Sequence, residues 1–232
     1  MLIIYLLKGT RGYRTEVSEN NHFMYHLKKS FRNKDGSKWK PPTEVILETF
    51  ESWMSNAVKS HDLSLDERKH EYFRVSSDMG NPWLFNELPF FKPKESLFIV
   101  RPQDQRGIHC RFGMKSIIAE AHFDGSRNMV AMLGGLRRWI MTAPDQCEDM
   151  YMLPMQHPSG RHSEIDWSNF SISDYPKFEN VKGFEVILQP GDVLYVPTFW
   201  IHYIVSLNVN YQCNTRSGAT NEYRQVLKKC GF

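Results

Sequence analysis

The chain has 232 residues, of which 41% are hydrophobic and 13% aromatic, and its formal net charge is +3. This length and composition predict a globular fold with a substantial core and exclude an intrinsically disordered chain. The net charge is too small to indicate nucleic acid or a membrane surface as a partner.

The amino-terminal stretch MLIIYLLKGTRGYR contains seven consecutive apolar residues before Lys8. That run is too short for a membrane span and short for a signal-peptide core, so a short strand or an anchoring tail is expected. Residues 8–40 are polar and basic. They fit either a solvated loop or a patch that binds a partner or a phosphate group.

Helical spacing follows the Pro41-Pro42-Thr43 stretch. It is carried by the apolar residues Ile46, Phe50, Trp53, Met54 and Ala57. Ser64 and Glu67 then have the spacing of a capping box, which predicts a short charged helix through about Phe73. The first third of the chain is therefore predicted to be mostly helix and loop.

From Ser96 onward the chain is predicted to form short strands, because Val, Ile, Leu, Tyr and Trp recur between turn signals. The predicted strands are SLFIVR, KSIIAEAHFD, RNMVAMLGG, LRRWIMTAP, FEVILQ, DVLYVP, HYIVSL and VNYQCN. Many strands without intervening helices favour an antiparallel sandwich or barrel. Residues 144–183 form a long insertion, typical of a functional loop, and a last helix is expected from Thr220.

The four cysteines are Cys110, Cys147, Cys213 and Cys230. None forms a C-x-x-C pair, and their spacing fits no zinc finger. The sequence therefore predicts reduced thiols in a reducing compartment.

His122 and Asp124 lie on either side of Phe123 in AEAHFDGSRN. On a strand, residues two apart face the same side, so this pair can present an imidazole and a carboxylate together. His202 follows QPGDVLYVPTFW, where a second strand could bring it to the same cavity. Two histidines and one carboxylate are the facial triad of non-haem Fe(II) oxygenases, which leaves three coordination positions open.

These motifs carry a resemblance to a known family. AHFDGSRNMVAMLGGLRRWIMTAPDQ, LPMQHPSGRHSEIDW and QPGDVLYVPTFWIHYIVSLNVNYQCN resemble, in this order, a JmjC domain of the cupin superfamily, and most resemble the group of the factor-inhibiting asparaginyl hydroxylase. The resemblance implies a mainly β fold with flanking helices, a double-stranded β-helix of the cupin or jelly-roll type. It also implies Fe(II) on His122, Asp124 and His202, with 2-oxoglutarate and O2 as cosubstrates. The expected division is an N-terminal region at 1–71, a JmjC-like domain at 72–218 and a C-terminal helix at 219–232.

The same resemblance implies contacts to 2-oxoglutarate. Asn128 and Asn214 are expected near the cosubstrate, with Asn208 and Asn210 as competitors if the register differs. Arg137 stands where the related hydroxylases usually carry a lysine for the far carboxylate, and strand alternation allows only one of Arg137 and Arg138 to face inward. Ala119 stands where the family often has Ser or Thr.

The resemblance implies an Fe(II)- and 2-oxoglutarate-dependent oxygenase that hydroxylates a protein or peptide side chain. Histone demethylation is less expected, because no zinc or reader module accompanies the domain. Ala119 and Arg137 keep two alternatives open, a catalytically silent cupin that only binds and a metal-dependent cupin enzyme without 2-oxoglutarate. An intracellular location, cytoplasmic or nuclear, is expected.

Overall fold

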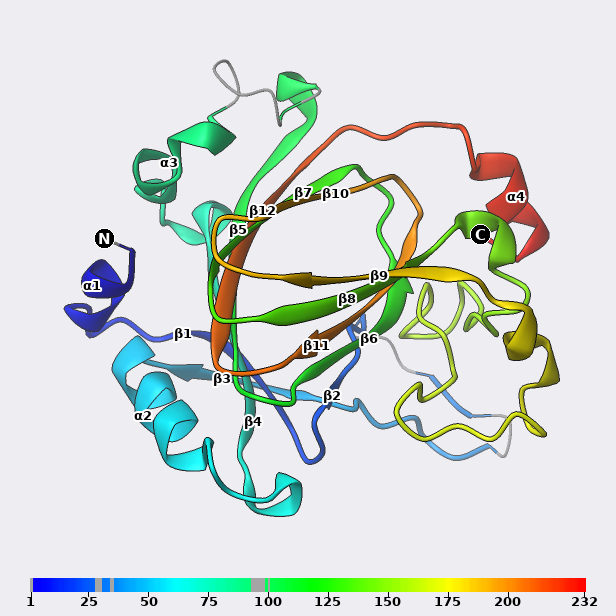
Figure 1. Ribbon diagram of the computed structural model, residues 1–232, viewed down its shortest axis with the longest axis horizontal. Helices are drawn as coiled ribbons and strands as arrows, with labels where there is room; N and C mark the ends of the chain where they lie inside the picture. The colour runs from blue at the N-terminus through cyan, green and yellow to red at the C-terminus, as the bar shows by residue number, and fades with distance from the viewer. Residues whose placement is uncertain (1, 28–30, 34–35, 93–98, 100) are drawn as a thin grey trace.

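The computed structural model describes residues 2–27, 31–33, 36–92, 99 and 101–232. Within these ranges the strands form a seven-stranded sheet, β10-β7-β12-β5-β4-β1-β3, and a five-stranded sheet, β2-β6-β11-β8-β9 (Figure 1). The strands are β1 Tyr13–Ser18, β2 His22–Phe23, β3 Glu44–Glu48, β4 His70–Ser76, β5 Gln105–Gly113, β6 Ile118–Phe123, β7 Asn128–Gly134, β8 Arg137–Thr142, β9 Gly183–Leu188, β10 Val193–Val196, β11 Ile201–Ser206 and β12 Asn210–Ser217. The predicted mainly β fold of the jelly-roll type is confirmed.

Short helices flank the two sheets. The α-helices are α1 Leu2–Leu7, α2 Phe50–Ser60, α3 Leu84–Glu87 and α4 Arg224–Lys229, and the 3-10 turns are Leu65–Glu67, Ser77–Met79, Pro89–Phe91, Pro102–Asp104, Pro144–Gln146 and Pro176–Asn180. Figure 1 shows α4 beside the long segment between β8 and β9. In the described part of the chain, no helix has the length and apolarity that crossing a membrane would require.

The strands expected from residue 115 onward are confirmed as β6 to β12. The expected strand at 96–101 lies outside the described residues apart from Ile99 and Arg101. β5 was not predicted from the sequence, although QRGIHCRFG alternates apolar residues with charged and polar ones, which is the pattern of a half-buried strand. Its alternation places Cys110 and Phe112 in the core, whereas Arg111 faces the opposite side.

Within the described residues, the first third contains four strands, β1 to β4, that were not predicted from the sequence. Ile46 lies in β3, an edge strand that pairs with β1, and α2 begins only at Phe50. The helix begins there because the Thr49 side chain accepts a hydrogen bond from the Ser52 backbone N–H at 3.2 Å. Val45 and Leu47 favour a strand by β-propensity, and pairing with β1 decides between the two conformations.

Three further element boundaries differ from the sequence-based expectation. The Ser64–Glu67 capping box is confirmed, but its helix ends after Glu67, because β4 then pairs with β1 and β5. The amino-terminal stretch is the helix α1 rather than a strand, and α4 begins at Arg224 rather than after Thr220. The proposed domain division at residue 72 falls inside β4, so both parts share one sheet.

An aromatic cluster holds α2 against the outer face of the large sheet. The Phe112 ring lies 5.2 Å from Phe50, 5.9 Å from Trp53 and 5.7 Å from Phe73, measured between centroids. All four side chains are fully buried. Apolar residues of these strands face α2. The polar residues that alternate with them therefore face the inner side of the sheet.

Replacing Phe112 with alanine is expected to lower the free energy of unfolding by about 3–5 kcal/mol, because it empties the centre of this cluster. Urea denaturation followed by circular dichroism measures the change. Phe184→Ala removes the same ring from a side chain that is 65% exposed, so it should change stability little. Equal losses in the two variants would contradict the assignment of the core.

The prediction of reduced cysteines is wrong, because the structure pairs all four in two disulfides. Cys110 in β5 and Cys213 in β12 are direct cross-strand partners in the large sheet. Cys147 and Cys230 join the segment after β8 to the end of α4. Sequence spacing could not reveal either pair, since 103 and 83 residues separate the partners.

Titration of the denatured, unreduced protein with a maleimide is therefore expected to find no free thiol, and four after reduction. Peptide mapping without reduction should recover the Cys110–Cys213 and Cys147–Cys230 linkages. Recovery of unlinked cysteine peptides would contradict the pairing.

Candidate metal centre and its cavity

Two strands of the small sheet bring the predicted triad together. His122 near the end of β6 is the cross-strand partner of His202 in β11, and Asp124 follows β6 directly. The centroids of the two imidazoles are 4.3 Å apart. One ligand atom from each of the three residues lies within 4.8 Å of the others, which a single divalent cation could bridge.

The backbone fixes which nitrogen each histidine can offer to a metal. The Nδ1 of His122 lies 2.7 Å from the Glu120 carbonyl oxygen, and the Nδ1 of His202 lies 3.0 Å from that of Trp200. Each Nδ1–H can donate to its carbonyl, so each Nε2 keeps its lone pair. This is the usual arrangement of metal-binding histidines, in which a second hydrogen bond fixes the tautomer.

The local electrostatics favour the protonation states that a metal needs. Burial lowers the pKa of His122 well below its usual value, and His202 and His162 add to the effect. Burial also lowers the pKa of His202. Burial alone would raise the pKa of Asp124, but Arg216 holds it below the usual range from 2.5 Å away. Neutral imidazoles beside an ionised carboxylate suit a divalent cation.

A β-bulge shapes the strand that carries His122. The pairing of β6 with β11 shifts between His202 and Ile204, so that Glu120 and Ala121 together oppose Tyr203. The extra residue allows both Ala119 and His122 to line the cavity, although strict alternation would separate them. Ala119 thus presents only a methyl group where the family often has a hydroxyl.

A cavity of about 840 Å³ opens in front of the triad. Strands of both sheets form its walls, and three other segments complete them: Tyr25 after β2, Met155 and Arg161 in the long loop, and Leu227 and Lys228 in α4. The volume falls within the range of small-molecule and cofactor sites. The 144–183 loop was expected at a substrate entrance, and it contributes to this wall.

Asn128 and Asn214 both lie in the cavity wall. The Asn214 Nδ2 donates to the Asn128 Oδ1 at 2.8 Å, and Arg111 Nη1 donates to the Asn214 Oδ1 at 2.6 Å. The two competitors have other partners: Asn208 Oδ1 accepts from the Leu136 backbone N–H, and Asn210 Oδ1 accepts from Arg137 Nε.

Arg137 faces inward and Arg138 faces outward. The Arg137 side chain is fully buried, whereas Arg138 forms a surface ion pair with Glu185 at 2.8 Å. Arg137 Nη1 donates to the Tyr72 hydroxyl at 3.0 Å, but Arg137 does not itself line the cavity. Tyr72 does, so Arg137 contacts a residue of the cavity wall.

Sequence reasoning missed four cavity residues of the large sheet: Tyr72, Arg74, Arg111 and Arg216. For Arg74 and Arg111 the available signal was alternation, because each is flanked by buried apolar residues in β4 and β5. Because neither stretch was predicted as a strand, the alternation was not interpreted as a sign of inward-facing side chains.

Two further histidines of the cavity wall, His162 and His109, have structural partners. The His162 Nδ1 lies 3.0 Å from the Ser159 carbonyl oxygen, and its Nε2 accepts from the Tyr25 backbone N–H at 3.3 Å. Both nitrogens are therefore engaged, and the ring stacks on His122 at 4.9 Å. His109 contacts the Ser76 hydroxyl at 3.0 Å and the Arg106 carbonyl oxygen at 2.7 Å.

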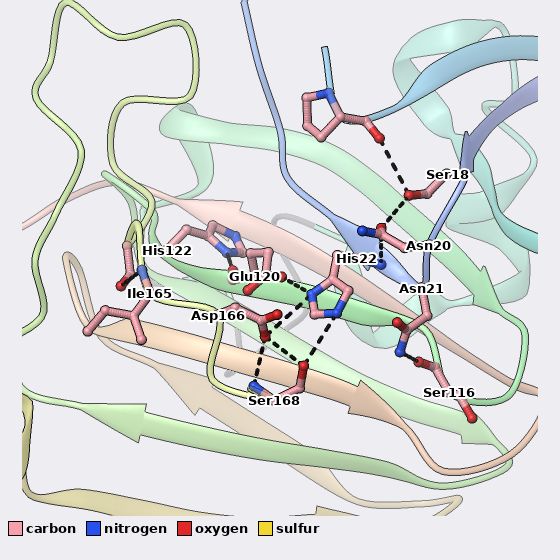
Figure 2. Close-up of polar contacts among 12 residues, drawn as sticks. Ser18, Asn20, Asn21, His22, Ser116, Glu120, His122, Ile165, Asp166 and Ser168 are labelled. Carbon is pink, nitrogen blue, oxygen red and sulfur yellow. Dashed lines mark hydrogen bonds and ion pairs between the residues drawn. The ribbon is translucent and has the colours of Figure 1, made fainter. Parts of the chain in front are cut away.

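A second polar cluster lies on the outer side of β6. His22 Nδ1 contacts a Glu120 carboxylate oxygen and lies 3.9 Å from Asp166 Oδ1, while Ser168 donates to Asp166 at 2.6 Å (Figure 2). The cluster ties β2 and the long loop to the strand that carries His122. The hydrogen bond to Glu120 raises the pKa of His22 against the opposing effect of burial.

Because the folded-state pKa of His22 is raised, its contribution to stability is complete below the unfolded-state pKa. It is lost as the pH rises through the folded value. The free energy of unfolding of the protein relative to His22→Gln should therefore be largest below about pH 6 and shrink as the pH rises above the usual pKa of histidine. Urea titrations at each pH measure this difference in the free energy of unfolding between the two proteins. A difference that does not depend on pH would contradict the ion pair.

Comparison with known proteins places this geometry in context. The model of the cupin-like domain family matches residues 12–219 of the chain. The chain is 28% identical over 165 residues to the Jumonji C domain-containing protein 5 of Drosophila melanogaster, covering 67% of this chain and 41% of that protein.

Two other relatives match shorter stretches. The lysine-specific demethylase JMJ31 of Arabidopsis thaliana is 27% identical over 46% of this chain and 21% of its own length. The tRNA wybutosine-synthesizing protein 5 of Danio rerio is 29% identical over 40% of this chain and 27% of its own length. The chain therefore spans less than half of each of these relatives.

Proposed function

The chain belongs to the cupin-like domain family, within the JmjC and cupin superfamily, and we propose that it is an Fe(II)- and 2-oxoglutarate-dependent oxygenase that hydroxylates a protein or peptide side chain. The observation that carries this proposal is the triad of His122, Asp124 and His202 at the wall of a large cavity, with both imidazole Nε2 atoms free. Membership in the group of the asparaginyl hydroxylase remains part of the proposal.

The residues present fit the proposed metal. Two neutral imidazoles and one carboxylate form an open site with three protein ligands, as a metal that must also bind cosubstrate and O2 requires. Arg216 and Arg161 orient the Asp124 carboxylate from 2.5 and 3.7 Å. When bound, Fe(II) with 2-oxoglutarate and O2 supplies the oxidising chemistry, and 2-oxoglutarate becomes succinate and CO2.

Tyr72 and Arg137 are proposed to hold the far carboxylate of 2-oxoglutarate. The Tyr72 hydroxyl accepts a hydrogen bond from Arg137, so its own proton is free to donate into the cavity. The buried charge of Arg137 then stabilises the carboxylate from behind this hydroxyl. Asn128 and Asn214 are proposed to contact the metal-binding end of the cosubstrate.

Aromatic side chains are proposed to exclude water from the reacting end. Trp139 stacks on His202 with centroids 5.5 Å apart, and Phe199 contacts Phe123 across the cavity wall. Phe199 has a left-handed backbone conformation at φ +68°, which is rare for a bulky residue and is often retained at functional sites. This conformation lets Phe199 line the cavity directly after β10.

Two alternative functions have specific support. Ala119 stands where the family often has Ser or Thr, so one hydroxyl donor is missing from the cosubstrate end of the cavity. The missing donor favours a catalytically silent binding protein. Arg137 lies behind Tyr72 rather than in the cavity wall, which favours a metal-dependent cupin enzyme that does not use 2-oxoglutarate. The intact triad favours catalysis over binding alone.

The proposed intracellular location, cytoplasmic or nuclear, remains a prediction. Disulfides persist in oxidising compartments, and the two found here favour such a compartment instead. Alkylation of thiols in intact cells before lysis, followed by mass spectrometry, distinguishes the two.

Succinate formation tests the proposed function. The protein is purified anaerobically, Fe(II), 2-oxoglutarate and O2 are added, and succinate is measured with the His122→Ala variant as control. Turnover of 2-oxoglutarate without substrate is expected at a low rate. Metal binding without 2-oxoglutarate binding would favour the metal-dependent alternative, and absence of both would favour the silent binding protein.

A further inference from the structure

Guanidinium groups form a row on the inner face of the large sheet. Arg74 in β4 and Arg111 in β5 are direct cross-strand partners, and both line the cavity. Like charges in such a pair repel each other unless nearby anions compensate them. Burial lowers the pKa of both groups, as expected when positive charge is removed from water.

Two of the arginines in this wall have carboxylate partners. Arg74 Nη2 lies 2.5 Å from Glu16 Oε2, and Arg216 Nη2 lies 2.5 Å from Asp124 Oδ2. Arg111 donates only to the neutral amide of Asn214. Among the residues that the structure describes, no carboxylate oxygen lies within 4.0 Å of the Arg111 guanidinium.

Two buried donors of neighbouring arginines in this wall lack hydrogen-bond partners within the described part of the chain. They are the Nε of Arg74 and the Nε of Arg216. A buried donor left unsatisfied costs about 1–3 kcal/mol, and more when it is charged. The wall therefore offers positive charge and free donors to a ligand that brings acceptors.

Arg111 lies where the main cavity adjoins a second, smaller pocket. Arg74, His109 and Arg111 line both the main cavity and an adjoining pocket of about 190 Å³, whereas Tyr72 lines only the main cavity. Exposed basic side chains, Arg106, Arg224 and Lys228, also line the main cavity. Basic side chains therefore line the cavity from its solvent-exposed residues inward to Arg111.

The cofactors would not neutralise this charge. Asp124 and the metal-binding carboxylate of 2-oxoglutarate would balance the two charges of Fe(II), and the far carboxylate would face Tyr72 and Arg137, so neither carboxylate of 2-oxoglutarate is left for Arg111. The anion must come from the substrate. A cationic substrate, such as a lysine or methylated lysine side chain, would meet repulsion here.

We propose that Arg111, assisted by Arg74, binds a carboxylate of the substrate, namely an Asp or Glu side chain of an acidic peptide. The inference rests on the proposed function, because it names the substrate class of the same cavity. An acidic side chain suits the site better than a nucleic acid, since one flexible carboxylate can reach a partly buried guanidinium. A phosphodiester backbone is instead bound mainly by exposed basic residues.

Binding of matched peptide pools tests this proposal. Capped pentapeptide pools with Glu, Gln or Lys fixed at the central position are titrated against the protein loaded with Mn(II) and 2-oxoglutarate, which gives a binding readout without turnover. The Glu pool should bind about tenfold more tightly than the Gln pool, and the Lys pool more weakly than both. Equal binding of the Glu and Gln pools would overturn the proposal.

Variants of Arg111 identify the residue responsible. Arg111→Gln should remove the preference for Glu over Gln, Arg111→Lys should keep part of it, and the exposed Arg138→Gln should keep all of it. The affinity for 2-oxoglutarate is measured in parallel for each variant. If Arg111→Gln weakens only 2-oxoglutarate binding and leaves the Glu preference intact, Arg111 serves the cosubstrate and the proposal is wrong.

Two further outcomes are distinguished in the same experiment. A single-stranded RNA that binds more tightly than the Glu pool at about 0.15 M salt would overturn the peptide assignment. Absence of 2-oxoglutarate binding would refute the proposed function. The Glu preference could still be measured on the protein loaded with Mn(II) alone, so the two failures remain separate.

Discussion

Replacing His202 with alanine is expected to abolish tight metal binding and to lower the rate of succinate formation by about a thousandfold or more. His202 supplies one of the three ligand atoms, and its Nδ1 is held by the Trp200 carbonyl so that only Nε2 can reach the metal. Because burial keeps this imidazole neutral, the substitution removes no charge from the core. Iron content after anaerobic loading and gel filtration measures the first effect, and the succinate assay measures the second.

The matched control is His157→Ala, which removes an imidazole from the long loop. The His157 Nδ1 accepts a hydrogen bond from the Ser159 backbone N–H, and the ring contacts Phe31 and Trp39 rather than the triad. That variant should retain full metal content. Circular dichroism should show that both variants fold. If His202→Ala binds iron normally, the triad does not form the metal site.

The sequence predicted the strands that carry the triad because their pattern is local. β6 and β11 are short and bounded by turn signals, and β11 is rich in β-branched and aromatic residues. Strand alternation likewise allowed only one of Arg137 and Arg138 to face inward, and the structure places Arg137 there. Predictions of this kind depend only on neighbours in the chain.

The features that sequence reasoning missed depend on contacts between distant segments. β3 and β4 form because they pair with β1, although their sequences also allow a helix. The bulge that brings Ala119 into the cavity appears only when β6 is paired with β11. The disulfides join residues far apart in the chain, so the reduced state inferred from spacing was wrong.

The same reasoning explains why the basic wall was not predicted. Arg74, Arg111 and Arg216 lie on three different strands, and their charge becomes concentrated only when β4, β5 and β12 are neighbours. The formal net charge of +3 gives no sign of it, because acidic residues elsewhere on the chain offset these arginines. Local charge in a cavity therefore has to be counted from the structure.

Replacing Arg137 with methionine is expected to weaken 2-oxoglutarate binding by about 10- to 100-fold, because it removes the charge behind the Tyr72 hydroxyl. Stability should change by no more than about 1 kcal/mol, since the lost hydrogen bonds are offset by removal of a buried guanidinium that lacks an acidic partner within the described chain. Isothermal titration with Mn(II)-loaded protein measures the affinity, and urea denaturation measures the stability. An unchanged affinity would show that Arg137 does not serve the cosubstrate.

Gly113 provides a second, steric test of the same site. A Cβ at this position would lie 2.9 Å from Arg137 Nη2 and 2.7 Å from Ser206 Oγ, so the glycine makes room for the longer arginine head. Gly113→Ala should therefore displace the guanidinium and weaken 2-oxoglutarate binding. The double variant Gly113→Ala with Arg137→Lys should recover part of the affinity, because lysine has a slimmer head and keeps the charge. If the lysine variant recovers nothing, Gly113 does not act through the space it leaves for Arg137.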